Sequence, residues 1–548
     1  MRPTVVAVAL LSVACVVARA EPPAPGPGPW IRVNQVGYLP DDPKVAVLSG
    51  PEPLAGTFRV GDFQADIGPD QGAWGPFAHN YRLDFSAVRG PGRFRVRFGE
   101  VESPEFAIGA DAYASVPDAL LGFMRLQRCG DNPAPGEPKC HLQDAIDVYT
   151  DEKVDLVGGW HDAADRLKHM ITTSYCVAAL RLVDDEGAQA EARHGAALVK
   201  KLHPRPDVIY VQIGDDRDHR PPATLWHDDR SDYGHGPGGP RSAWPATGKP
   251  EGPKYKNAST GKASLAGRCA AVMALMGDVE TARSMYRLGL DNPGVAMSVP
   301  VAAPHYYGES TDWDDMEWAA VELYRATKEP KFLEDAVAHA DRAGDNAWMG
   351  RDAHGHYEFF PYVNLAHWRL HELVGPEVQA RLAGYYRTGL ERIRERALKN
   401  PYRIGTPMVW CSTNDAIAFA TQARLYEKMT GDDQFRGLAA ESRDWILGRN
   451  PWGVSFVIGV PEGGVASRRP HHMFHRLANR LPVGGLVDGP VTKEINDSLK
   501  FSPFEDDPLA PFQSDFAVYH DEFADFSTNE PIIDGTVSLL LLLDVWHR

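Results

Sequence analysis

The feature that most constrains the fold is a helical period that begins near Asp111 and continues to the C-terminus. Apolar residues recur there at the spacing of amphipathic helices, and no convincing strand alternates with these helices. A sheet built from βαβ units is therefore not expected. The candidate helices span residues 113–128, 169–184, 188–202, 262–276, 279–290, 313–327, 331–344, 361–373, 377–398, 414–429, 434–447 and 530–546.

The candidate helices are even in number, and short turns join several neighbours. Examples are Met276-Gly277-Asp278 and Thr430-Gly431-Asp432. Helices joined by such short turns pack as antiparallel hairpins, and hairpins of this kind can close into a ring of paired helices. The count alone does not establish that the ring closes.

The region before the helices has a different pattern. From Trp30 to about Ile108, short alternating segments are separated by Gly, Pro and Asp turns, which predicts a small β-sandwich at 30–109, ahead of a helical domain at 110–548. Residues 21–29, EPPAPGPGP, are a linker that cannot hold regular structure. The candidate strands are Ile31–Val33, Lys44–Leu48, Thr57–Val60, Asn80–Phe85 and Arg93–Phe98.

Residues 1–20 have the pattern of a secretory signal peptide. Arg2 supplies the positive start, Val5–Val17 the short apolar core, and Ala18-Arg19-Ala20 a cleavage site before Glu21. The mature protein is expected to be secreted or periplasmic. No later run predicts a membrane span, because Leu539–Leu543 is too short and is flanked by charge.

Three long segments interrupt the helices, at 129–168, 208–258 and 449–529. Segments of this length in a compact domain usually line a functional surface. The formal net charge of −17 and the lack of a Lys/Arg cluster argue against nucleic acid as the partner at that surface. A neutral or cationic ligand fits better.

The first long segment ends in Gly158–His169, GGWHDAADRLKH, where Asp162 and Asp165 lie three residues apart. At that spacing both carboxylates can project to one side of a turn. The glycines allow close approach to a ligand, and Trp160 offers a flat apolar face on which a sugar can stack. Taken alone, the pair is more simply explained as a helix N-cap and a first-turn acid.

Cleavage of a glycosidic bond needs two carboxyl groups, one to protonate the leaving oxygen and one to activate water or attack. Glu530 is the candidate partner of the aspartate pair, because it begins the last helix directly after a polar loop. The simpler explanation is again a helix N-terminal glutamate beside an Asn cap. In the same segment, His471, His472 and His475 lie on a loop after Pro470 and are predicted to bind sugar hydroxyls rather than a metal, with chance surface histidines as the alternative.

A second chemical motif is Cys129-x10-Cys140-His141. Thiolates and imidazole suit a structural zinc, which needs a fourth ligand, and His161 can supply it. A Cys129–Cys140 disulfide in an exported protein and two free thiols are the competing interpretations.

Taken together, these motifs resemble glycoside hydrolase family 9, the family of inverting cellulases, in its subgroup with an N-terminal immunoglobulin-like domain. Ile31–Pro40 resembles the opening strand of that domain, and Gly158–Asp165 resembles the family's GGWHDAGD. The stretch from Ser412 to Pro451 is similar to the family's stretch that ends in LLGRNP. Arg469–His475 resembles the family's RPHHR loop, and Asp521–Glu530 resembles its terminal motif. Separate motifs in the right order are far more specific than any one of them.

The resemblance implies an (α/α)6 barrel whose loops at one end form the substrate cleft. It makes Asp165 the general base, Asp162 its partner in holding the attacking water, and Glu530 the general acid, in an inverting site with base and acid roughly 6.5–9.5 Å apart. It also agrees with a structural zinc on Cys129, Cys140, His141 and His161, and it makes bound calcium possible, with no ligands assigned. The predicted substrate-binding residues are Trp160, His471, His472 and Asp521.

The chain departs from the family pattern in the expected substrate loops. Ala164 stands where the family has a glycine, and Arg166 stands where an aromatic or small polar residue is usual. Met473 stands where the family has an arginine, whose role Arg476 would have to take over. A proline directly after the glutamate, as in Glu530-Pro531, is also unusual. These departures bear on the choice of sugar rather than on the fold or the chemistry.

The expected activity is hydrolysis of β-1,4-glucan by a secreted glycosidase. One alternative is an exo-β-glucosaminidase acting on chitosan oligomers, whose ammonium groups would meet Asp215, Asp216 and Asp218. The other is a carbohydrate-binding protein without activity, which is disfavoured because all three expected carboxylates are present. Endo or exo action depends on whether the 208–258 segment blocks the cleft.

Overall fold

The structure is a computed structural model that describes residues 28–219, 225–346, 358, 362–499 and 507–547. The predicted signal peptide and all but the end of the predicted linker lie outside these residues. Among the helices described, none is both long and apolar enough to cross a membrane.

Six helices form a closed inner ring, because each of them contacts the next and the last contacts the first. They are buried almost throughout, as in α2, where every residue from Met170 to Leu180 is buried. A helix that is apolar all round must lie inside a large core. The inner helices are α2 (Met170–Leu182), α4 (Ala263–Leu275), α6 (Trp313–Thr327), α8 (Leu365–His371), α10 (Ser412–Thr430) and α14 (Ile533–His547).

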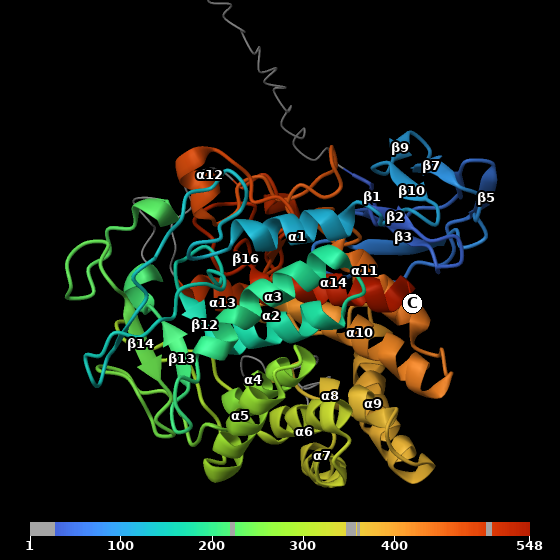
Figure 1. Cartoon of the computed structure of the whole chain (residues 1–548). Coiled ribbons are helices and arrows are strands. Elements are labelled where there is room, and N and C mark those ends of the chain that lie inside the picture. Colours follow the sequence, from blue (N-terminus) through green and yellow to red (C-terminus); the bar gives the residue numbers. More distant parts are fainter. Residues whose placement is uncertain (1–27, 220–224, 347–357, 359–361, 500–506, 548) are drawn as a thin grey trace, which may run out of the picture.

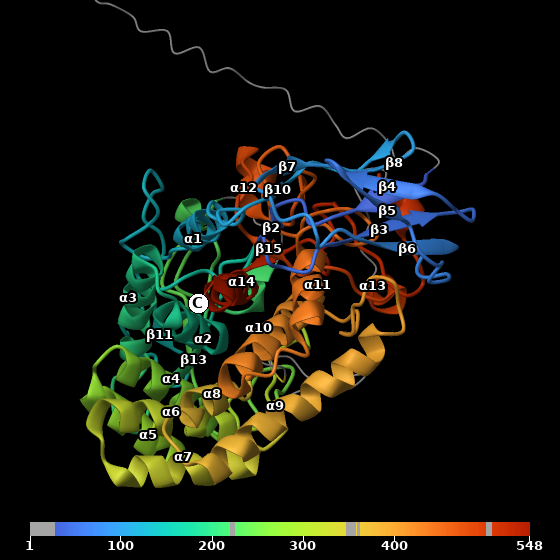
Figure 2. The same cartoon turned by 90° about the vertical axis from the view of Figure 1, so that its right-hand side faces the viewer.

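Six amphipathic helices cover this ring from outside (Figures 1 and 2). Local signals set their ends: the Asp185 carboxylate caps α3 by accepting from the Ala188 N–H, and Asp278 caps α5 through the Thr281 N–H. The prediction of an (α/α)6 barrel is confirmed, and each of the twelve expected helices is present. The outer helices are α1 (Val116–Leu126), α3 (Glu186–Lys201), α5 (Val279–Asp291), α7 (Pro330–Ala343), α9 (Pro376–Ala397) and α11 (Arg436–Ile446).

The N-terminal β-sandwich, drawn in blue in Figure 1, has its own apolar core. It is held against α11: Asn34 Nδ2 donates to Asp444 Oδ1 over 2.8 Å, and Arg82 forms a two-point ion pair with Glu441. The strands are β1 (Trp30–Arg32), β2 (Gly37–Tyr38), β3 (Val45–Gly50), β4 (Thr57–Val60), β5 (Phe63–Asp66), β6 (His79–Asp84), β7 (Gly92–Phe94), β8 (Val96–Phe98), β9 (Val101–Glu102) and β10 (Phe106–Ile108).

A small sheet, which the sequence did not predict, orders the first two long segments. Its strands follow the order β11 (Ile146–Asp147), β14 (Ser242–Pro245), β13 (Tyr210–Ile213) and β12 (Lys168–His169). The sheet joins the segment before α2 to the one before α4. The third segment contains α12 (Met473–Ala478), β15 (Leu486–Val487), α13 (Lys493–Leu499) and β16 (Pro531–Ile532), with β15 and β16 paired.

All these long segments precede inner helices. Figure 1 shows β12, β13, β14 and α12 gathered at the end of the barrel where α14 begins, opposite the C-terminus. The N-termini of the inner helices therefore point to one end of the barrel, and their dipoles favour negative charge there. An acidic site is expected at that end.

Candidate active site and metal centre

The structure brings together the three predicted catalytic carboxylates, although they come from opposite ends of the chain. The Ala164 N–H, between the two aspartates, donates to Glu530 Oε1 over 3.0 Å. The Ile533 N–H at the start of α14 donates to the Asp162 carbonyl over 3.1 Å. The loop carrying Asp162 and Asp165 is thus fixed directly against Glu530.

Within the loop, the two aspartates have different surroundings. Asp162 is buried, and its carboxylate accepts from the hydroxyls of Thr172 and Tyr307, the latter over 2.8 Å. Burial first, and then the negative charges of Asp534 and Asp165, hold the pKa of Asp162 well above its usual range. Asp165 is partly exposed, and its Oδ1 accepts from the Leu167 N–H over 2.9 Å. Asp165 is therefore the more accessible carboxylate.

Two further buried acids belong to this site. Asp534, on the first turn of α14, accepts from the Tyr362 hydroxyl and from Asn414 Nδ2 (3.0 Å), and burial raises its pKa to about 6. Asp488 follows β15 and donates its backbone N–H to the Glu530 carbonyl over 3.0 Å. Neither acid was singled out from sequence, because a lone aspartate at a helix start or in a turn carries no local signal of chemistry.

The prediction that Trp160 stacks on a sugar is wrong. Its ring is fully buried, it packs on Gly195 of α3, where a Cβ atom would collide with it, and its Nε1 donates to Glu191 Oε2 over 3.2 Å. Trp160 instead fixes residues 158–161 against the barrel.

Two of the three predicted loop histidines, His471 and His472, have different surroundings. His472 is fully buried, its Nε2 lies 3.1 Å from Gln127 Oε1, and its Nδ1 accepts from the Phe474 N–H, so its predicted contact with sugar is wrong. Burial lowers the pKa of His472 to about 3, which keeps it neutral. His471 is partly exposed and stacks on Phe523. Burial lowers the pKa of His471, and the negative charges of nearby acids, Asp165 among them, act against that shift. His471 therefore lies at the site.

Asp521 holds the loop that carries His471. Its Oδ1 accepts from Ser467 Oγ (3.0 Å) and from the Arg469 N–H (2.9 Å), and both of its oxygens accept from the Arg468 N–H. These bonds shape the loop, and direct contact of Asp521 with a sugar stays a prediction.

The three aspartates that were predicted to bind an ammonium group are instead bonded to other residues of the protein. Asp215 forms a two-point ion pair with Arg217, and Asp216 accepts from the backbone N–H groups of residues 301–303. Asp218 accepts from Tyr233 and Ser231. The predicted role of these acids in binding a cationic sugar is therefore not supported by their geometry.

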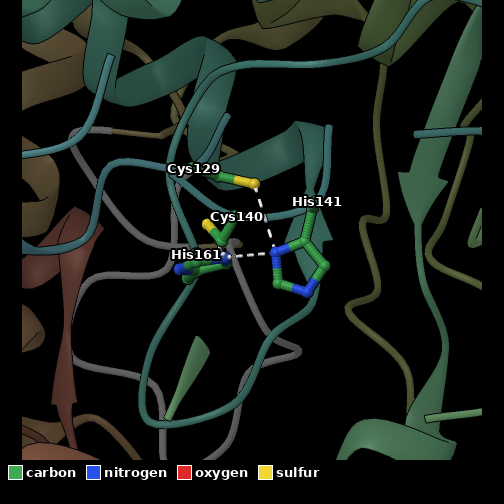
Figure 3. A group of neighbouring side chains, drawn as sticks. All are labelled: Cys129, Cys140, His141 and His161. Carbon is green, nitrogen blue, oxygen red and sulfur yellow. Dashed lines mark hydrogen bonds between the residues drawn. The ribbon is translucent and has the colours of Figure 1, made fainter. Parts of the chain in front are cut away.

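The residues predicted to hold zinc do converge. The thiols of Cys129 and Cys140 and one ring nitrogen each of His141 and His161 all lie within 4.8 Å of one another, as Figure 3 shows. The Cys129 Sγ to His141 Nδ1 distance is 3.6 Å, the Cys140 Sγ to His161 Nε2 distance 3.8 Å, and the two nitrogens are 3.3 Å apart. Tetrahedral zinc, with bonds of about 2.3 Å to sulfur and 2.0–2.1 Å to nitrogen, fits such spacings.

Two further observations support a metal rather than the alternatives. The cysteines are not joined by a disulfide, and His141 Nε2 lies 3.1 Å from Asp229 Oδ2, an arrangement that orients metal-binding histidines. Asp229 also pairs with Arg166 over 3.3 Å, so Arg166 supports the residues of the candidate metal centre. Met473 is buried in the apolar cluster beside the two cysteines, where a charged arginine would be costly to bury.

Replacing Cys129 with serine should remove the bound metal and destabilise the protein. Loss of a structural metal costs several kcal/mol, and each kcal/mol shifts Tm by about 2–4 °C in a large domain, so Tm should fall by about 5–10 °C. Metal analysis and calorimetry of the purified protein test this. Cys269→Ala, at a buried thiol distant from this cluster in sequence, should keep the metal; equal metal content in both variants would contradict the assignment.

Comparison with known proteins covers nearly the whole chain. The profile described as "Glycosyl hydrolase family 9" matches residues 113–543, and "Cellulase N-terminal ig-like domain" matches residues 26–103. Endoglucanase C of Cellulomonas fimi is 26% identical, covering 95% of this chain but only 52% of that protein. A cellodextrinase of Butyrivibrio fibrisolvens is 24% identical, covering 85% of this chain and 91% of that protein.

Solved structures agree with the fold. A metagenome-derived glycoside hydrolase family 9 endoglucanase superimposes with a TM-score of 0.74 at 22% identity, covering 94% of this chain and 98% of that one. An endoglucanase from Alicyclobacillus acidocaldarius, a single mutant, gives a TM-score of 0.75 at 20% identity, covering 95% of this chain and all of that one. The similarity thus includes the N-terminal sandwich as well as the barrel.

Proposed function

Because the chain belongs to glycosyl hydrolase family 9, we propose that it is a secreted enzyme that hydrolyses β-1,4-glucosidic bonds with inversion at the anomeric carbon. The observation that carries this proposal is the contact of Glu530 with the loop that holds Asp162 and Asp165. The names of the relatives, an endoglucanase and a cellodextrinase, support the choice of a β-glucan as substrate. The chain spans about half the length of that endoglucanase. The activity of the whole protein that contains this chain therefore also belongs to the proposal.

In this mechanism Glu530 donates its proton to the glycosidic oxygen as the bond to the anomeric carbon breaks. Asp165, the accessible aspartate, removes a proton from the water that attacks the opposite face of the sugar. Asp162, fixed by Thr172 and Tyr307, holds that water in line. The N-termini of the inner helices favour the negative charge that remains on the carboxylates.

The metal centre has a supporting part in this proposal. Zinc, when bound, would cross-link the segment 129–141 to His161 and supply no chemistry at the sugar. His161 directly precedes Asp162, so its fixed ring limits the movement of the aspartate loop. Calcium stays a prediction with no assigned ligands.

Secretion and the domain boundaries are supported by separate features. The pattern of residues 1–20 supports export. A separate apolar core in the β-sandwich supports the division into 30–109 and 110–548.

The experiment that tests the proposal is a parallel assay on cellulose, cello-oligosaccharides and chitosan oligomers. Hydrolysis of the glucans with an α-anomeric first product, followed by NMR, is expected. Cleavage of the amino sugars alone would favour the exo-β-glucosaminidase, and hydrolysis of no β-glycan would favour a binding protein. The lengths of the products from a defined oligosaccharide separate endo from exo action.

A further inference from the structure

The peptide group between Arg166 and Leu167 is hydrogen-bonded on both sides, and one of its partners is the proposed base. Its N–H donates to Asp165 Oδ1 over 2.9 Å. Its C=O accepts from Nη1 of Arg241. Because a peptide group is planar and rigid, a bond at its oxygen also fixes the direction of its N–H. Two hydrogen bonds and one peptide group thus connect a guanidinium to the carboxylate of Asp165.

Arg241 is a buried cation whose orientation is fixed by a carboxylate. It directly precedes β14 and is 1% exposed. Its Nε donates to Asp144 Oδ1 over 2.9 Å, and its Nη2 donates to Asp144 Oδ2 over 2.7 Å. This two-point contact uses the planar fork of arginine and leaves Nη1 to bind the Arg166 carbonyl. The guanidinium is therefore held at three points.

The same carboxylate holds a second buried cation, Lys168 of β12. Its Nζ lies 2.8 Å from Asp144 Oδ2 and donates to the carbonyls of Leu156 (2.9 Å) and Gly158 (3.1 Å). Those carbonyls precede the two catalytic aspartates in the chain, whereas the carbonyl that Arg241 binds follows them. Asp144 and its two cations therefore hold the aspartate loop on both sides.

These three charges stay ionised although they are buried. Burial acts to raise the pKa of Asp144, but the charges of Arg241 and Lys168 outweigh it and lower that pKa below its usual range. Buried ion pairs often contribute little net stability, because removing charges from water is costly. Apolar side chains could fill the same space, but they could not donate to the Arg166 carbonyl. The position of this ionic group favours a role in the site over a role in stability alone.

Arg241 also lies close to the candidate metal centre. Its Nη2 is 3.9 Å from Cys129 Sγ, and its Nη1 is 3.7 Å from Asp218 Oδ2. A substitution of Arg241 could therefore act through the metal ligands as well as through the aspartate loop. Any test of its role has to separate these two routes.

We propose that Arg241 is a positioning residue for the general base, fixing the Asp165 carboxylate toward the attacking water through the peptide group of Arg166 and Leu167. This inference rests on the proposed function, in which Asp165 is the base. Asp144 acts by holding the guanidinium in place. A catalytic group that is misplaced by about 1 Å can cost about 10²-fold in rate, so a contact of this kind affects turnover.

The test is the kinetics of Arg241→Lys on cello-oligosaccharides. Lysine keeps the charge, but its single ammonium cannot reproduce the fork that binds both Asp144 oxygens and the Arg166 carbonyl. We expect kcat to fall by about 10–100-fold with little change in KM. In an Asp165→Ala background, the same substitution should cause almost no further loss, because the carboxylate that it positions is absent.

The matched control is Arg82→Lys. Arg82 has the same set of contacts, a two-point pair with Glu441 and a bond from Nη1 to the Pro401 carbonyl (2.9 Å), but it joins the β-sandwich to the barrel. Its replacement should leave kcat unchanged even if Tm falls. The metal content of Arg241→Lys should equal that of the unmodified protein. A loss of metal that parallels the loss of kcat would reject the inference in favour of an effect through the metal centre.

A second variant covers the case in which Arg241→Lys does not fold. Lys168→Arg keeps the charge but disturbs the bonds to the carbonyls of Leu156 and Gly158, and it should give the same fall in kcat and the same lack of further loss with Asp165→Ala. Unchanged kcat in the folded variant, or losses that multiply with that of Asp165→Ala, would overturn the inference.

Failure of this inference can be told apart from failure of the proposed function. If Asp165→Ala is inactive while Arg241→Lys keeps the full rate, only the role of Arg241 is rejected. If Asp165→Ala hydrolyses β-glucan normally, or the unmodified protein does not hydrolyse it, the proposed function itself is rejected.

Discussion

Glu530→Gln should lower kcat on cello-oligosaccharides by about 10²–10⁴-fold, the usual contribution of a general acid. Glutamine preserves the shape that receives the Ala164 N–H but has no proton to give to the leaving oxygen. A substrate with an aryl leaving group of low pKa needs less protonation, so the loss on that substrate should be much smaller. Rates on both substrates, measured with the same preparation, test this difference.

The matched control is Glu462→Gln, at an exposed glutamate in the long segment that precedes Glu530. It should leave both rates within a factor of about two, since surface substitutions rarely matter. Equal losses on the two substrates by Glu530→Gln would indicate a distorted site rather than a missing proton.

The helices could be predicted from sequence because each one carries a local signal. Inner helices such as α10 are buried along their length, and outer helices such as α7 alternate buried and exposed residues at the helical period. The sheet β11–β14–β13–β12 could not be predicted in this way. Strands of two to four residues, such as Lys168–His169, show no period, and their pairing depends on contacts distant in sequence.

The site was predicted where several residues carried a motif, and missed where burial decided the role. The loop of Asp162 and Asp165 contacts Glu530, and the four predicted metal ligands converge at a separate point. Trp160 and His472 have the right chemistry for sugars but lie in the core, which sequence does not reveal. Asp488 was missed because its place opposite Glu530 arises only from β15 pairing with β16.

The departures from the family pattern acquire a physical reason in the structure. Arg166 pairs with Asp229, which in turn binds His141, so the loop from His161 to Arg166 is tied to the metal centre at both ends. The Ala164 backbone N–H, not its side chain, makes the contact with Glu530, so the added methyl group leaves this contact intact. Both departures thus lie in a loop whose backbone is strongly fixed.

Asp165→Ala should lower kcat by about 10²–10⁴-fold, because no base remains to deprotonate the attacking water. The smaller side chain leaves room for azide, a nucleophile that needs no deprotonation. Added azide should restore part of the rate and give a sugar azide of inverted, α configuration. The rate as a function of azide concentration, with NMR of the product, tests both statements.

The comparison that decides the role of Asp165 is the response of Glu530→Gln to azide. Azide cannot replace the proton that Glu530 gives to the leaving oxygen, so this variant should stay inactive on cello-oligosaccharides at every azide concentration. A β-glycosyl azide from Asp165→Ala would show that the azide reached the sugar from the leaving-group side, against an inverting site. Rescue of Glu530→Gln but not of Asp165→Ala would mean that the acid and base are exchanged, with Glu530 facing the water and the aspartate loop facing the leaving group.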